Sequence, residues 1–199
     1  MVPVPPTYEV RLARPSDAPM FARHIVRHLA ESGEHGEPHF APMSDVDAVH
    51  VEESSERRWR TEIGRVGWGR AWLVMRGRAT GVSPDEPLRV VGHAELRGPH
   101  VEAGLHRAEF SIGLERAARG MGIGRALAEA VLDWARSETE LVWIDLRVFA
   151  SNTPARALYQ KLGFRELGTI PDALRAADGA AVDDVLMTIS LERAPSAEV

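Results

Sequence analysis

Hydrophobic residues recur along the chain with two periods, one typical of helices and one typical of strands. Between residues 123 and 135 the apolar side chains repeat at helical spacing, which predicts an amphipathic helix of three to four turns. Residues 142–149 instead alternate between an apolar and a mixed set, which predicts a strand with two different faces. Because a strand is also predicted before the helix, over residues 106–114, the connection should be a parallel crossover.

The other periodic segments predict further strands and helices around this unit. Residues 88–96 and 106–114 should form an antiparallel pair. A polar helix over residues 52–65 carries Trp59 and Ile63 at a spacing of four and is predicted to lie on the surface. Further strands are predicted over residues 8–13, 72–75, 164–170 and 185–191, further helices over about 17–32 and 152–163, and loops over 33–51 and 171–184.

Length and composition favour one folded domain. With 199 residues, 44% hydrophobic and 27% charged, the chain suits a single hydrophobic core, which we assign to residues 8–192 with flexible tails at 1–7 and 193–199. A net charge of -5 and scattered arginines argue against nucleic acid as a partner. No apolar run is long enough to span a bilayer, and no signal peptide is recognisable, so we expect a cytoplasmic protein without a membrane partner.

The chain contains no cysteine, and this limits its chemistry. Disulfides, thiolate zinc sites and a cysteine nucleophile are all excluded. If the protein transfers an acyl group, direct attack by the acceptor on a bound thioester is therefore the simpler route.

A glycine-rich segment, Arg119-Gly120-Met121-Gly122-Ile123-Gly124-Arg125, lies between a predicted strand and the long predicted helix. Glycines let the backbone approach a ligand closely, and the N–H groups at a helix amino terminus favour a phosphate or pyrophosphate. The dinucleotide fingerprint G-x-G-x-x-G fails, because Arg125 or Leu127 stands where its third glycine is required. The Gly-Lys-Ser/Thr sequence of nucleoside-triphosphate loops is also missing.

The same segment resembles the acetyl-CoA signature of GCN5-related N-acetyltransferases, the GNAT family. This signature, R/Q-x-x-G-x-G/A, is matched by Arg119, Gly122 and Gly124. A second stretch, NTPARALYQKLGF from Asn152 to Phe164, resembles the second signature of the family. Together with AEFSIGL and VVGHAELRG, which precede the glycines, the resemblance covers about half the chain. AEFSIGL and the end of the chain resemble the branch that includes phosphinothricin and other small-amine or amino-acid N-acetyltransferases.

This resemblance implies an α/β fold in which helices flank a mixed, mostly antiparallel sheet of six to seven strands. It implies acetyl-CoA as the donor, bound where the fourth and fifth strands part, and a primary amine of a small molecule or peptide as the acceptor. Backbone N–H groups of Ile112, Gly113 and Leu114 are expected to bind the acetyl carbonyl. The rest of the cofactor is expected to contact Arg119, Gly120, Met121, Gly122, Ile123, Gly124, Arg125 and Asn152. The oligomeric state stays open, with a homodimer as one alternative.

Three side chains are candidates for acid-base catalysis. An aliphatic amine has a pKa of roughly 10 and arrives protonated, and by resemblance Glu109 accepts its proton, directly or through water. The alternative is that Glu109 is a surface carboxylate or one that forms a salt bridge, for example with Arg107 or Arg147, and Glu95 on the preceding strand is the second candidate for the base. By resemblance Tyr159 protonates the departing thiolate, and its alternative role is that of a packed core residue.

Five histidines lie among residues 24–50, and His24 and His28 are four residues apart. The pair lacks the glutamate of an H-E-x-x-H motif, so we expect no metal and interpret these histidines as surface or loop residues. Part of the loop that follows is expected to line the acceptor pocket. The sequence does not identify the acceptor, and a non-catalytic acyl-CoA-binding or regulatory module on the same fold is the alternative function.

Overall fold

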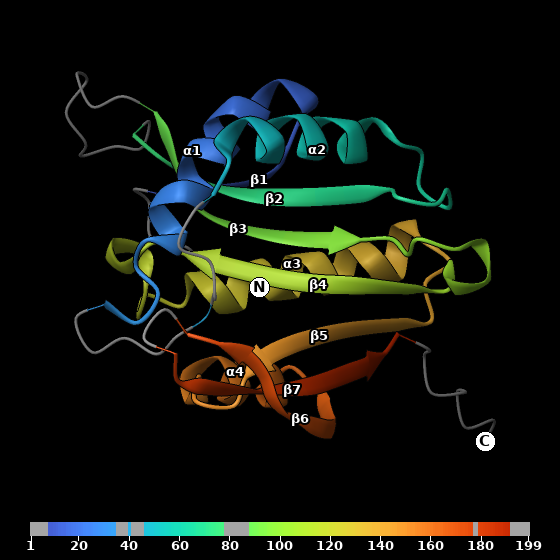
Figure 1. The fold of residues 1–199 in the computed structure, drawn as a ribbon. Helices are drawn as coiled ribbons and strands as arrows, with labels where there is room; N and C mark the ends of the chain where they lie inside the picture. Colours follow the sequence, from blue (N-terminus) through green and yellow to red (C-terminus); the bar gives the residue numbers. More distant parts are fainter. Residues whose placement is uncertain (1–7, 35–39, 41–45, 78–87, 177–178, 192–199) are drawn as a thin grey trace.

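One sheet organises the chain, with strand order β1-β2-β3-β4-β5-β7-β6 (Figure 1). The computed structural model describes residues 8–34, 40, 46–77, 88–176 and 179–191, so the two predicted tails lie outside the described residues. Neighbouring strands run antiparallel except β4 and β5, which are parallel. The predicted mixed, mostly antiparallel α/β fold is therefore confirmed.

The helices and strands follow one another nearly as the periodicity predicts. The strands are β1 (Tyr8–Leu12), β2 (Gly69–Arg76), β3 (Arg89–Arg97), β4 (Arg107–Leu114), β5 (Trp143–Phe149), β6 (Arg165–Arg175) and β7 (Ala181–Ser190). The α-helices are α1 (Ala18–Leu29), α2 (Ala48–Arg60), α3 (Ile123–Glu138) and α4 (Thr153–Lys161). Short 3-10 turns are η1 (Pro15–Asp17), η3 (Glu102–Gly104) and η4 (Arg116–Ala118).

Helices cover both faces of the sheet because its central strands are apolar on both sides. In β2, Leu73 and Met75 belong to one hydrophobic cluster with Phe21 of α1 and Trp59 of α2. The residue between them, Val74, belongs to a second cluster on the side of α3 and α4. Figure 1 accordingly shows α1 and α2 on one side of the sheet, and α3 behind β3 and β4. Strand alternation thus creates two separate cores.

α3 is the predicted amphipathic helix, and it connects two parallel strands. Ile123, Leu127, Val131 and Ala135 recur every four residues and are each at most 1% exposed. Burial of such a stripe contributes about 1.5–3 kcal/mol for each large side chain, which holds the helix against the sheet. The chain leaves β4, forms α3 and returns as β5 beside β4, so the predicted parallel crossover is confirmed.

The prediction for the second helix was wrong in its limits and in the exposure of Trp59, although the helix lies on the surface as predicted. α2 spans Ala48–Arg60 instead of residues 52–65, and the carboxylate of Asp47 caps it by accepting hydrogen bonds from two backbone N–H groups. Trp59 is only 5% exposed and packs edge-on against Phe21, with ring centroids 5.2 Å apart. Ile63 lies beyond the helix. One large aromatic side chain on an otherwise polar helix therefore anchors α2 to α1 and the sheet.

The loop predicted over residues 171–184 was also wrong. Most of it is strand, because β6 continues to Arg175 and β7 begins at Ala181. A register shift between Ile170 and Leu174 lets the two strands remain paired across an irregular stretch. Such a bulge interrupts the alternation of side chains, which hides the strand from a pattern of period two. None of the described helices is long and apolar enough to cross a membrane.

Candidate active site

The glycine-rich segment forms a bend that opens α3. Gly120 and Gly122 have φ angles of 74° and 78°, in the left-handed region that favours glycine. Gly122 is the N-cap residue of α3, and no side chain caps the helix there. The first N–H groups of α3 therefore lie at the positive end of the helix dipole without a capping side chain, an arrangement that suits an anion.

This bend lies directly against the end of β4. A Cβ atom placed on Gly124 would lie 3.5 Å from Cδ1 of Leu114 and 3.9 Å from Cδ1 of Ile112. The Ile123 side chain points into the core and is 1% exposed, whereas Met121 is 36% exposed. The fold therefore brings the predicted carbonyl-binding strand and the predicted phosphate-binding bend together, and their contact with the cofactor stays a prediction.

The two arginines that flank the bend are held by the protein itself. Arg119 donates from Nε to the carbonyl oxygen of Leu114 at 2.8 Å and forms an ion pair with Glu31 at 2.6 Å. Its guanidinium also lies over the ring of Phe40, 5.3 Å from the centroid. Arg125 pairs with Glu129 at 2.7 Å, one turn along the surface of α3. Phosphate contacts by either arginine stay predictions, and Arg119 would have to share its charge with Glu31.

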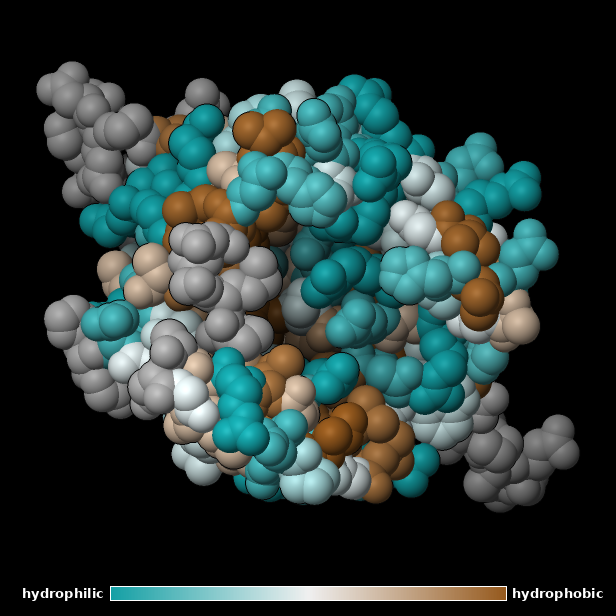
Figure 2. All heavy atoms as spheres, viewed as in Figure 1, coloured by the Kyte–Doolittle hydropathy of each residue, from teal (hydrophilic) through white to brown (hydrophobic). Residues whose placement is uncertain are grey.

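The parallel strands β4 and β5 part from each other beside the bend. Their pairing covers only Arg107 to Glu109 of β4, whereas β3 pairs with β4 as far as Leu114. β5 meanwhile remains paired to β7 through Phe149. The edge of β4 from Phe110 to Leu114 is therefore not paired to β5, as the predicted entry of a pantetheine chain requires. Figure 2 shows this face hollowed near its centre, at the level of β3 and β4, with hydrophilic residues along the hollow.

Glu109 lies at the point where the strands part. It is exposed, and within the described residues it forms no ion pair with Arg107 or Arg147. Those two arginines pair instead with Asp145, at 2.6 Å, and with Asp184, at 2.5 Å. The structure therefore does not show the alternative of a carboxylate paired with Arg107 or Arg147, whereas the alternative of a surface carboxylate agrees with the exposure of Glu109.

The second candidate base, Glu95, occupies a different environment. It is 6% exposed and lies 3.4 Å from Arg58 of α2 and 4.0 Å from Arg97. It faces the same side of the sheet as Glu109, because β3 and β4 pair Glu95 with Ser111. A buried carboxylate between two arginines is suited to hold them in place, and it is less available to a substrate than Glu109.

Tyr159 is buried in α4, with 5% of its surface exposed. Its ring packs against Phe110 of β4 and Phe164, with centroids 6.2 and 5.8 Å away. Burial raises the pKa of the phenol above its ordinary value, so the hydroxyl is protonated at neutral pH and is a weaker acid than a phenol in water. Asn152 caps the same helix, accepting a hydrogen bond from the N–H of Ala155 at 3.3 Å. The predicted cap is confirmed, and contacts of both residues with the cofactor stay predictions.

A cluster of buried histidines beside Gly113 was not predicted. His24 and His28 of α1 are 0% and 7% exposed, so the interpretation of these two as surface residues was wrong. Nδ1 of His24 lies 2.9 Å from a carboxylate oxygen of Glu115, and its Nε2 lies 2.9 Å from Nδ1 of His93 in β3. His35 and His39 lie outside the described residues. In the part of the chain that the structure describes, no group of three or more residues could hold a metal ion.

Burial sets the charge of this cluster. It lowers the pKa of His24 and holds that of His93 well below its usual value, and neighbouring imidazoles lower the latter further. The pKa of His28 falls to about 3, through burial and the nearby His24 and Arg119. Burial alone would raise the pKa of Glu115, but hydrogen bonds from His24 and Arg27 bring it below its usual value. At neutral pH the cluster thus holds three neutral imidazoles and one carboxylate.

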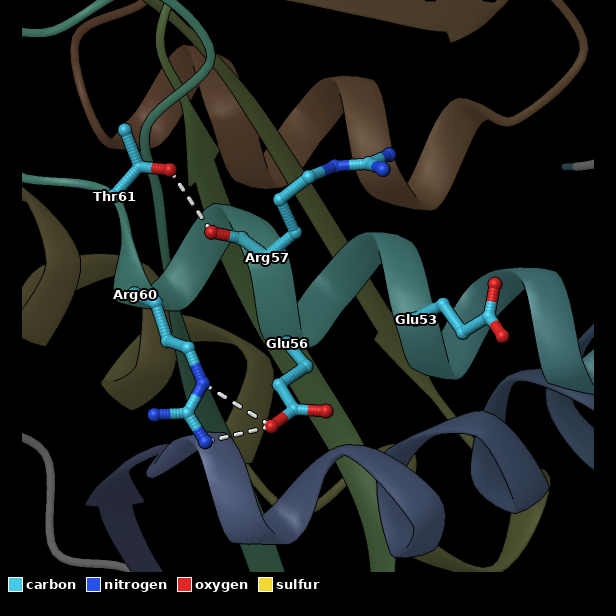
Figure 3. Close-up of a pocket in the computed structure, with 5 residues that line it drawn as sticks. All are labelled: Glu53, Glu56, Arg57, Arg60 and Thr61. Carbon is cyan, nitrogen blue, oxygen red and sulfur yellow. Dashed lines mark hydrogen bonds and ion pairs between the residues drawn. The ribbon is translucent and has the colours of Figure 1, made fainter.

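A depression on the outer surface of α2 is separate from this region. It is lined by Glu53, Glu56, Arg57, Arg60 and Thr61, and Figure 3 shows Arg60 turned toward Glu56, with which it forms an ion pair at 2.7 Å. None of the candidate catalytic or cofactor residues lines it. The ion pair links residues four apart on one exposed helix, where such pairs add roughly 0.3–0.5 kcal/mol. We assign no role in catalysis to this depression.

Comparison with solved structures finds the same fold in other proteins. The protein yncA from Salmonella typhimurium, solved with acetyl-CoA, has a TM-score of 0.73 and 20% identity, covering 96% of this chain and 98% of its own. A GCN5-related N-acetyltransferase from Kribbella flavida has a TM-score of 0.67 and 28% identity, covering 92% and 98%. A spermidine N-acetyltransferase from Vibrio cholerae, solved with CoA and spermine, has a TM-score of 0.66 and 20% identity, covering 93% and 96%.

Sequence comparison supplies the family. No curated protein matches the chain. The sequence model of the acetyltransferase (GNAT) family matches residues 47–164, which is more than half of the 199 residues and includes both signatures. The chain therefore belongs to the acetyltransferase (GNAT) family.

Proposed function

We propose that the chain transfers the acetyl group directly from acetyl-CoA to a primary amine of a small molecule or peptide. The observation that supports this most is the place where β4 leaves β5: pairing stops at Glu109, and the uncovered edge of β4 runs toward the glycine bend of α3. A thioester held along this edge would lie within one strand length of both an anion site and a carboxylate. Because the chain has no cysteine, a cysteinyl intermediate cannot form, and direct attack of the acceptor on the thioester is the simpler route.

In this proposal, backbone N–H groups and Asn152 bind the donor. The N–H groups of the bend from Gly120 to Arg125 bind the diphosphate, and Asn152 contacts the pantetheine. Backbone N–H groups between Ile112 and Leu114 bind the acetyl oxygen, where negative charge develops as the amine attacks.

Two side chains move protons. Glu109 is exposed and without an ion pair among the described residues, so it can take a proton from the incoming ammonium group, directly or through a water molecule. Tyr159, whose phenol stays protonated, gives a proton to the departing thiolate. The remainder of the reaction needs only that the amine and the thioester be held together.

A non-catalytic acyl-CoA-binding module is the second candidate, because the burial of Tyr159 against Phe110 and Phe164 is also what a purely structural tyrosine would show. Calorimetric titration with acetyl-CoA, followed by thiol-release assays over a panel of amines, separates the two. We expect binding and thiol release with at least one amine. Binding without thiol release on any member of a panel of amino acids, polyamines, aminoglycosides and peptide amino termini would support the module instead.

Several finer assignments belong to this proposal. We place the acceptor at the open face of β4. Within the family, the likeness to the phosphinothricin and amino-acid branch stays a prediction from the sequence. A cytoplasmic location, the absence of a nucleic-acid partner and a homodimeric state stay predictions as well, and gel filtration with light scattering measures the last of them.

A further inference from the structure

A chain of hydrogen bonds crosses the interior from Glu115 to His93. Glu115, directly after β4, is 5% exposed; His24 of α1 is 0% exposed; and His93 of β3 is 6% exposed. Both links, Glu115 to His24 and His24 to His93, measure 2.9 Å. Burying a carboxylate and several imidazoles costs folding free energy unless they are paired, so an arrangement this polar in a core calls for a role beyond packing.

The order of donors and acceptors along this chain is fixed at the Glu115 end. A carboxylate only accepts hydrogen bonds, and Glu115 also accepts one from Nε of Arg27 at 2.9 Å. His24 must therefore carry its proton on Nδ1 and offer a lone pair at Nε2. Nδ1 of His93 then has to donate to that lone pair. The neutral His93 imidazole is left with an unprotonated Nε2, which can accept a proton.

His93 lies beside the backbone of β4 at the residue where the acetyl group is expected. It pairs with Gly113 in the β3–β4 register, four residues beyond the last pairing between β4 and β5. A Cβ atom on Gly113 would come within 2.6 Å of Cε1 of His93 and 2.5 Å of Nε2 of His28. Only glycine fits there, and its missing side chain leaves the His93 ring in contact with the backbone of the proposed carbonyl-binding strand.

Resting on the proposed function, we propose that Nε2 of His93 accepts the second proton that the acceptor nitrogen loses. The ammonium group gives its first proton to Glu109, and the neutral amine attacks the thioester carbon. As the C–N bond forms, the nitrogen becomes cationic and gives its second proton to His93. The C–S bond then breaks, and the thiolate takes a proton from Tyr159. The substrate amine thus loses two protons, and coenzyme A gains one.

Glu115 makes this transfer favourable by stabilising the imidazolium that forms. Proton shifts along the two hydrogen bonds spread the new positive charge from His93 through His24 to Glu115. A neutral imidazole suffices as the base, because a nitrogen that is bonding to a carbonyl carbon is far more acidic than a free ammonium group. His24 and Glu115 do not reach the substrate, and they act as positioning residues.

The charges around the cluster decide how strongly His93 holds a proton. From α1, His24 and His28 face His93, and Arg27 faces Glu115. From β3, Arg97 acts on His93 and Arg89 lies 3.9 Å from Glu115. All of these except the carboxylate oppose protonation of His93. Removal of the Glu115 charge should therefore lower the pKa of His93 further, and the direction of this pKa change can be measured.

Nitrogen NMR of the histidine side chains tests the hydrogen-bond chain without any turnover. At pH 7.5 we expect His24 and His93 both to carry their proton on Nδ1, with Nε2 of His93 unprotonated. Assignments can come from His24→Asn and His93→Gln variants. A His93 with its proton on Nε2 would overturn the proposal, because Nε2 would then have no lone pair to accept the second proton of the amine.

Kinetics of Glu115→Gln and His93→Gln test the proton transfer itself, with exposed His106→Gln as the matched control. We expect His93→Gln to lower kcat by about 10²- to 10⁴-fold with little change in acetyl-CoA affinity. In Glu115→Gln the acidic limb of the pH–rate profile should move to lower pH, with a lower maximum. Wild-type rates and an unmoved limb in both variants, while Tyr159→Phe is impaired, would overturn this inference alone. A wild-type protein that releases no thiol with any amine would contradict the proposed function itself.

Discussion

Glu109 of β4 lies opposite Asp145 of β5, and this is the last pair between the two parallel strands. Asp145 forms an ion pair with Arg107 of β4 at 2.6 Å and accepts a hydrogen bond from Thr188 of β7 at 2.7 Å, so both neighbouring strands hold its carboxylate in place. Glu109 lies on the same face of the sheet as Asp145, but it takes no part in these interactions. Glu109 therefore has a carboxylate without an ion pair at the point where β4 and β5 separate, and we assign this carboxylate to the substrate amine.

The Glu109→Gln variant should lose activity in a pH-dependent way. Near pH 7 the amine arrives protonated, so loss of the proton acceptor should reduce kcat/KM by about 10²-fold or more. Near pH 10 much of the amine is already neutral, and the deficit should shrink. Steady-state kinetics from pH 6.5 to 10 measure this.

Exposed Glu102→Gln is the matched control for Glu109→Gln and should behave as the wild type. If Glu95→Gln shows the pH-dependent loss and Glu109→Gln does not, the base is Glu95.

The Tyr159→Phe variant should separate chemistry from binding. Phenylalanine keeps the ring contacts with Phe110 and Phe164, so the fold and the acetyl-CoA affinity should be retained. Without the proton donor, kcat should fall by about 10²- to 10⁴-fold. Tyr8→Phe, at the other tyrosine of the chain, removes a hydroxyl to which we assign no proton transfer and which donates to the carbonyl oxygen of Ala117, so it serves as the comparison. Unchanged turnover in Tyr159→Phe would leave the residue with a packing role only.

The buried histidines predict that the fold loses stability in mild acid. Their pKa values are lowered in the folded protein, to about 3 for His28, whereas in the unfolded chain they titrate near 6.5. Between these values the unfolded state binds more protons, so the free energy of unfolding should fall as pH falls, by about 1.4 kcal/mol per pH unit for each such histidine. The lowered pKa of Glu115 acts in the same direction below about pH 4.5.

Chemical unfolding at pH 5.0 to 7.5 measures this slope. His28→Phe keeps an aromatic ring beside Phe40 but cannot be protonated, so its slope should be smaller by the contribution of one histidine. Exposed His100→Gln should leave the slope unchanged. A wild-type protein with equal stability at pH 5.0 and 7.5 would contradict the assignment of these imidazoles as neutral and buried.

Local signals in the sequence were enough to predict the glycine bend and the two helices to which we assign the cofactor. α3 carries a regular apolar stripe. Before it, Gly120 and Gly122 have positive φ angles, a backbone conformation that favours glycine. Asn152 likewise caps a helix within three residues of itself. Such features depend on neighbours in the sequence, so no knowledge of the fold was needed to find them.

The histidine cluster could not be predicted in the same way. Its two hydrogen bonds join residues 69 and 91 positions apart, and they exist only because α1 lies across β3 and the end of β4. On a helical stripe with Phe21, the spacing of His24 and His28 was compatible with burial. The sequence does not reveal that α1 packs against β3, so a surface location of His24 and His28 was equally consistent with their spacing.

Binding of acetyl-CoA to Gly122→Asp, measured by calorimetric titration, tests the central claim most directly. Gly64→Asp is the control, because Gly64 has a similar left-handed φ of 84°, and a Cβ there meets no heavy atom within 4 Å. Both variants should lose roughly 1–2 kcal/mol of stability through backbone strain. If the opening of α3 binds the diphosphate, only Gly122→Asp should lose acetyl-CoA binding. Equal affinity in both variants would contradict the account.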